Sequence, residues 1–150
     1  MILIDTNALV VLIIGLMDTK LFKNHKRTSI YEEKDFYDLQ AVIGSLDRLI
    51  VLPNIWTEVD NLLNGFSGNY KSVYIETIST AIKTTSEKYI ESANAIKHTY
   101  FAELGVTDSL VLEYSKECYM LITSDSKLSD YAIANGIKVY DMIKSRNERF

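Results

Sequence analysis

The 150-residue sequence contains little cysteine, histidine or proline, and each shortage excludes a class of site or fold. The single cysteine, Cys118, cannot form a disulfide within the chain, which favours a reducing compartment. One cysteine and two histidines give no spacing that is typical of a zinc site. One proline and six glycines exclude collagen-like and low-complexity chains, and 47% apolar residues predict a single folded domain over residues 1–150.

Positive charge is also scarce. A net charge of −4 argues against a partner held by charge alone, unassisted nucleic-acid binding included. A bound divalent metal would reverse the sign locally. The exception is the segment 20–29, which we expect to be an exposed loop. Its cations Lys20, Lys23, Lys26 and Arg27 are either RNA backbone contacts or simply solvated.

The longest hydrophobic run, residues 8–17, is too short for a membrane span of about 20 residues. It is not preceded by a basic region or followed by a small-residue cleavage site, so it does not resemble a signal peptide. We therefore expect no membrane partner and a cytoplasmic protein.

What the chain does contain is an alternation of apolar strands and helical patterns. Short apolar runs at 1–4, 49–52, 119–123 and 137–140 are typical of buried strands, and helical spacing occurs at 8–17, 35–47, 54–66 and 127–135. Between 70 and 103 there is no strand pattern, which predicts two helices separated near 84–86. Residues 141–150 are predicted to be a frayed tail. This order predicts a three-layer α/β/α fold with a central, mostly parallel sheet.

Four acidic residues occupy related positions in this alternation. Asp5 and Asp125 each follow a buried strand, at the sheet edge where open α/β sheets bind ligands. Glu58 and Asp108 fall on the apolar faces of helices. Each acid also has a structural explanation, such as a helix cap for Asp125 or dipole stabilisation for Asp108. Carboxylates that converge in a pocket take up protons unless a cation compensates, and oxygen ligands favour Mg²⁺ or Mn²⁺.

The motifs that carry these acids resemble those of the PIN domain family. They are Ile4-Asp5-Thr6-Asn7, Thr57-Glu58, Val106-Thr107-Asp108-Ser109-Leu110 and Thr123-Ser124-Asp125, with the acids 53, 50 and 17 residues apart. The resemblance covers essentially the whole chain. The connection between the first helix and Glu58 is longer than the family's pattern.

The resemblance implies a metal-dependent ribonuclease in which Asp5, Glu58, Asp108 and Asp125 bind one or two Mg²⁺ or Mn²⁺ ions. Asn7 and Thr123 match the small polar residues beside that cluster. It also implies a homodimer and, for members that are toxins, a partner antitoxin. The expected reaction is phosphodiester hydrolysis by a metal-activated water, which requires neither histidine nor cysteine.

Two other interpretations remain open. A haloacid-dehalogenase-like phosphatase also begins with an aspartate at the end of its first strand. That family needs a second acid two residues later, where this chain has Asn7. The third interpretation is a non-catalytic PIN-like module that binds RNA or protein, and the presence of all four acids argues against it.

Overall fold

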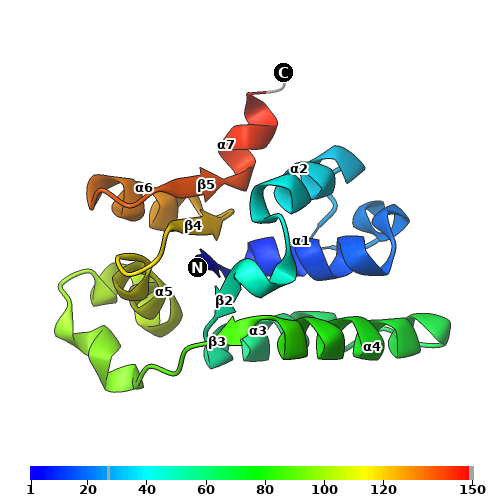
Figure 1. The fold of residues 1–150 in the computed structure, drawn as a ribbon, viewed down its shortest axis with the longest axis horizontal. Coiled ribbons are helices and arrows are strands. Elements are labelled where there is room, and N and C mark those ends of the chain that lie inside the picture. Colours follow the sequence, from blue (N-terminus) through cyan, green and yellow to red (C-terminus); the bar gives the residue numbers. More distant parts are fainter. Residues whose placement is uncertain (27, 149–150) are drawn as a thin grey trace.

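The computed structural model describes residues 1–26 and 28–148, and its centre is a parallel five-stranded sheet. The strands are β1 (Ile2–Ile4), β2 (Leu49–Val51), β3 (Ser86–Glu87), β4 (Met120–Thr123) and β5 (Val139–Asp141). Their order in the sheet is β3-β2-β1-β4-β5 (Figure 1). The α/β class and the parallel sheet predicted from the sequence are confirmed.

Helices cover both faces of this sheet. The α-helices are α1 (Thr6–Met17), α2 (Glu33–Ile43), α3 (Pro53–Leu63), α4 (Asn69–Thr84), α5 (Phe101–Ser115), α6 (Ser126–Ala134) and α7 (Met142–Asn147). Three 3-10 helices also occur, at η1 (Thr19–Lys23), η2 (Leu46–Arg48) and η3 (Ser92–Lys97). Helix α1 contacts α2, α3 and α4 on one side of the sheet, while α5 contacts α6 on the other, which gives three layers (Figure 1). In the described part of the chain, every helix is too short or too polar to cross a bilayer.

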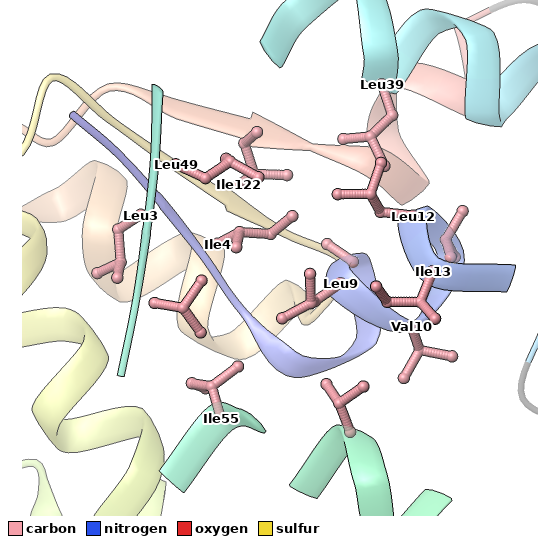
Figure 2. Close-up of a cluster of buried hydrophobic side chains, with 14 of the residues drawn as sticks. Leu3, Ile4, Leu9, Val10, Leu12, Ile13, Leu39, Leu49, Ile55 and Ile122 are labelled. Atoms are coloured by element: carbon pink, nitrogen blue, oxygen red, sulfur yellow. The ribbon is translucent and has the colours of Figure 1, made fainter. Parts of the chain in front are cut away.

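The core forms around α1, because this helix is apolar on all sides. Its residues from Ala8 to Gly15 are all buried, as expected for a helix enclosed by other elements. Figure 2 shows Leu12 on the side of α1 toward Leu39 of α2, and Leu9 on the side toward β1. Since α1 is fixed on several sides, the residue that starts it is fixed as well.

The order in which strands are added to the sheet reverses between β1 and β4. The chain proceeds from β1 outward to β2 and β3, then returns to place β4 on the other side of β1. In such sheets the carboxyl ends of the two strands at the reversal flank a crevice in which ligands bind. Asp5 follows β1 and Asp125 lies two residues after β4, so both acids lie beside this crevice.

Two sequence-based predictions about the later elements were wrong. Residues 70–103 hold one long helix, α4, followed by β3 and η3, in place of two helices. Strand β3 has only two residues, both exposed, so it carries no apolar alternation that the sequence could reveal. The predicted frayed tail is instead helix α7 over residues 142–147, because the apolar side chain of Met142 is buried in the core. Arg149 and Phe150 lie outside the described residues.

The basic segment 20–29 also differs from the loop that the sequence predicts. Part of it belongs to η1, where the side chains of Leu21 and Phe22 are buried. Lys20 and Lys23 stay exposed because these two apolar neighbours take the inward positions. The segment is therefore anchored to the core, with its lysines facing solvent.

Candidate functional site

An open cleft of about 550 Å³ lies at the carboxyl ends of β1 and β4, between which the strand order reverses. Its lining consists of Asp5, Thr6, Asn7, Glu58, Asn61, Leu62, Leu104, Val106, Thr107, Asp108 and Asp125. All four acids predicted from the sequence are in this set, together with Asn7. None of these described lining residues carries a positive charge. The cleft thus collects four carboxylates without a cation among the side chains that line it.

Asp5 is the most buried of the four acids, at 4% exposed. It is the N-cap of α1, and its Oδ1 accepts the backbone N–H of Thr6 at 2.7 Å. Its Oδ2 accepts the hydroxyl of Thr123 at 2.9 Å. The pKa of Asp5 is raised to about 6, mainly because the carboxyl group is buried. The hydrogen bonds from Thr6 and Thr123 lower this pKa, and the charges of Asp125 and Glu58 raise it.

Asp125 is tied to Asp5 through the same threonine. The Thr123 hydroxyl accepts the backbone N–H of Asp125 at 3.0 Å while donating to Asp5. Asp125 also caps α6, because its Oδ1 accepts the backbone N–H of Leu128 at 3.0 Å. The cap that the sequence suggested for Asp125 is confirmed, and this cap coexists with a place in the cleft lining.

Glu58 projects into the cleft from α3, and two hydroxyls hold its carboxylate. The Thr6 hydroxyl donates to Oε1 at 2.5 Å, and the Thr107 hydroxyl donates to Oε2 at 2.9 Å. Asn54 is not the N-cap of α3, and it donates its side-chain N–H to the Thr107 hydroxyl at 3.1 Å. The cap position belongs to Leu52, followed by Pro53, which suits the first turn of a helix. Glu58 is therefore fixed by residues of two other helices, α1 and α5.

Asp108 is placed by an interruption in α5. Gly105 has φ +80°, so helical geometry breaks there and resumes before Asp108. No hydrogen bond or ion pair reaches the Asp108 carboxylate from residues 1–26 or 28–148. Burial, together with the charges of Asp5, Asp125 and Glu58, raises the pKa of Asp108 to about 7. Asp108 is thus the acid that the surrounding protein compensates least.

The four acids share a cleft, but they do not form a closed cage. Within the described residues, no three acidic, histidine or cysteine side chains are close enough together to hold one metal ion. The oxygen-only donor set nevertheless has the chemistry that Mg²⁺ prefers. This ion keeps several waters and is commonly held by one or two carboxylates plus substrate phosphates. The side chains present therefore fit a largely hydrated Mg²⁺ or Mn²⁺ better than a fully enclosed one.

The predicted RNA contacts lie outside the cleft. Lys20 and Lys23 line a second hollow together with Tyr31 and Lys34, and Lys26 is exposed nearby in the chain. Arg27 lies outside the described residues. Tyr31 lies between the two regions, because its side chain lies close to Ser124, the residue before Asp125.

Sequence reasoning missed the hydroxyl and amide groups that orient the acids. Thr6 and Thr107 were named only within the motifs that carry the acids, and Asn61, which lines the cleft one turn after Glu58, was not considered. The signal was available for the threonines, since each directly adjoins an acid, Asp5 or Asp108. Another acid at the end of a strand, Asp141 of β5, caps α7 and does not line the cleft.

No family model, curated protein or solved structure matches the chain. Its function has to be inferred from the chemistry of the cleft.

Proposed function

We propose that the chain is a PIN-like, metal-dependent endoribonuclease that hydrolyses RNA phosphodiesters in the acidic cleft. One observation carries the proposal: four carboxylates from separate elements line one cleft whose described lining has no cation. Two of them, Asp5 and Asp108, have raised pKa values, mainly because they are buried and also because the other carboxylates are near. Such an arrangement is costly unless a cation binds.

The chain's own residues would divide the work in the cleft. Asp5 and Asp108 have pKa values raised by burial and by the neighbouring carboxylates, and they are the expected direct ligands of Mg²⁺ or Mn²⁺. Glu58 and Asp125 border the same space and would hold coordinated waters or a second ion. A bound Mg²⁺ or Mn²⁺ supplies water activation and charge stabilisation at the phosphodiester. Asn7, exposed at the cleft, is a polar contact for the substrate or for those waters.

The second hollow, here called the basic hollow for its three lysines Lys20, Lys23 and Lys34, is the proposed contact for the RNA backbone. Glu32 and Glu33 also line it, so its lining has a net charge of only +1. Tyr31 lines this hollow and lies close to Ser124, the residue before Asp125, so the hollow is on the side of the molecule where Asp125 borders the acidic cleft. Lys20 and Lys23 are exposed there without a salt bridge to any described residue. A backbone bound at the cleft would thus meet lysines next to it, which offsets the overall negative charge of the protein.

The deciding experiment measures cleavage of a mixed RNA pool with Mn²⁺, beside Mn²⁺ binding by calorimetry. We expect cleavage that needs the metal, is abolished in Asp5→Asn and is unchanged in Asp130→Asn, the same change at an exposed acid of α6. Protein that neither binds Mn²⁺ nor cuts RNA would refute the proposal. Hydrolysis of a small phosphate ester without RNA cleavage would point to a phosphatase.

A second experiment tests the basic hollow. Changing Lys20 and Lys23 together to Glu should weaken RNA binding roughly tenfold or more and lower its salt dependence, while Mn²⁺ affinity stays the same. The matched control changes Lys71 and Lys83, exposed on α4, to Glu. Equal loss of RNA affinity in both double variants would show that only net charge matters.

The absence of a three-ligand cluster among residues 1–26 and 28–148 favours one alternative, a non-catalytic PIN-like module that binds RNA or protein. Its signature would be RNA binding with Mn²⁺ or Mg²⁺ present and no cleavage. A homodimer, or a small partner protein such as an antitoxin, is part of either proposal and would appear as a complex in light scattering or co-purification.

A further inference from the structure

Both oxygens of the Glu58 carboxylate are engaged by threonine hydroxyls from different helices. Thr6 lies in the first turn of α1 and donates to Oε1, while Thr107 of α5 donates to Oε2 at 2.9 Å. The partners are separated by 52 and 49 residues in the chain. The contacts therefore depend on the folded arrangement of α1, α3 and α5 and on no local turn.

The two hydroxyls are themselves fixed. The backbone N–H of Thr6 donates to Asp5 Oδ1 at 2.7 Å, which sets the orientation of the residue at the start of α1. The Thr107 hydroxyl accepts an N–H from Asn54 at 3.1 Å, so its single proton is directed to Glu58. An amide that donates to a hydroxyl, which donates to a carboxylate, forms a chain in which each hydrogen bond strengthens the next.

A carboxylate oxygen can accept two hydrogen bonds or ligate a metal while accepting one. The hydroxyls thus occupy one side of each Glu58 oxygen, and the other side remains available toward the cleft that Glu58 lines. Groups that hydrogen-bond to a metal-binding carboxylate set its direction, and their loss commonly weakens metal binding by 10–100-fold.

We propose that Thr6 and Thr107 are positioning residues that clamp the Glu58 carboxylate, so that its free lone pairs face a hydrated divalent ion in the cleft. This inference rests on the proposed metal-dependent function. It adds a specific claim, namely that the threonine hydroxyls set the affinity for the ion although they do not touch it. Asn54 acts one step further out, through Thr107.

The test compares Thr6→Val and Thr107→Val with Thr6→Ser and Thr107→Ser. Valine keeps the shape of threonine and removes the hydroxyl, whereas serine keeps the hydroxyl. The control is Thr57→Val, since the Thr57 hydroxyl donates only to the Pro53 carbonyl within α3, at 3.2 Å. Mn²⁺ affinity is measured by calorimetry without RNA, and folding is checked by circular dichroism and thermal melting.

We expect each valine variant at Thr6 or Thr107 to bind Mn²⁺ about tenfold more weakly or worse, and the double variant weaker still. The serine variants and Thr57→Val should stay within about threefold of the parent. In cleavage assays the Mn²⁺ concentration for half-maximal rate should rise in the valine variants, and excess Mn²⁺ should restore part of the rate.

The two levels of the proposal fail in different ways. If the parent binds Mn²⁺ and the valine variants bind it equally well, the clamp is refuted and the proposed function stands. If the parent protein itself binds no Mn²⁺, both are refuted. Serine variants as weak as the valine variants would also overturn the clamp, because the hydroxyl would then not be the group that matters.

Discussion

The hydroxyl of Thr123, the last residue of β4, donates at 2.9 Å to Oδ2 of Asp5, the residue that follows β1, and both side chains are buried. The Thr123 hydroxyl oxygen also accepts the backbone N–H of Asp125, at 3.0 Å. One hydroxyl thus connects Asp5, which follows β1, with Asp125, which follows β4. The parallel register that pairs Ile4 with Ile122 makes this connection possible, because it brings the two strand ends level.

Thr123→Val should therefore destabilise the protein although it conserves volume. The change removes the hydrogen-bond partner of Asp5 Oδ2 and of the Asp125 N–H, at a cost of about 1–3 kcal/mol in the free energy of unfolding. Thr123→Ser retains the hydroxyl and loses one methyl group, so it should cost less than Thr123→Val. Urea unfolding of the three proteins at pH 7 measures the difference. Equal stability of Thr123→Val and the parent would show that the hydrogen bond contributes nothing.

The raised pKa values of two cleft acids predict how stability depends on pH. The folded-state values, about 6 for Asp5 and about 7 for Asp108, lie above the ordinary value of 3.8. Between about pH 4 and pH 7 the folded protein therefore binds more protons than the unfolded chain. The contribution of these two groups to the free energy of unfolding must then fall as the pH rises through that window.

Asp108→Asn removes one of these charges and should stabilise the protein above pH 7. After allowance for the partial exposure of the side chain, the gain is about 1–2 kcal/mol, or a rise in Tm of roughly 2–8 °C. At pH 4, where Asp108 is protonated in the folded protein, the gain should vanish. Asp130→Asn, an exposed change on α6, is the control for net charge. Melting curves at pH 4 and pH 8 decide it, and a gain independent of pH would contradict the assignment.

The sequence was sufficient to predict that the four acids would line one site, and physical reasons explain this. A strand end and the apolar face of a helix are local properties that the pattern of residues reveals, and parallel strands bring their carboxyl ends to one edge. Asp5 and Glu58 were predictable on that basis. The hydroxyl of Thr6 on Glu58 was not, because it joins residues 52 apart and depends on how α1 and α3 pack.

The elements that the sequence missed are those whose stability comes from the backbone or from distant packing. Strand β3 consists of Ser86 and Glu87, both exposed, and only its pairing with Ile50 and Val51 of β2 makes it a strand. A hydrophobic pattern says nothing about such backbone pairing at a sheet edge. The helix break before Asp108 was predictable, because glycine readily adopts a positive φ that other residues rarely adopt, and Gly105 does so in the structure.

Gly15 in α1 is predicted to tolerate no side chain. A Cβ at this position would lie 2.2 Å from the ring of Phe36, whose side chain is buried. Gly15→Ala should therefore cost about 1–3 kcal/mol through overpacking, despite the better helix propensity of alanine. The control is Gly65→Ala, where a Cβ has no atom within 4 Å and where stability should be unchanged or slightly raised. Thermal melting of both variants tests this, and similar Tm values would contradict the close packing of α1 on α2.

Helix α7 should contribute to the stability of the domain, because Met142 at its start is only 3% exposed. Helix α7 also contacts α2, so the C-terminal segment connects the sheet edge at β5 to the layer above it. Met142→Ala should lower the free energy of unfolding by about 2–5 kcal/mol. Lys144→Ala, an exposed change on the same helix, should stay within about 0.5 kcal/mol of the parent. If the segment were a frayed tail, the two substitutions would have equally small effects, and urea unfolding would show overlapping transitions.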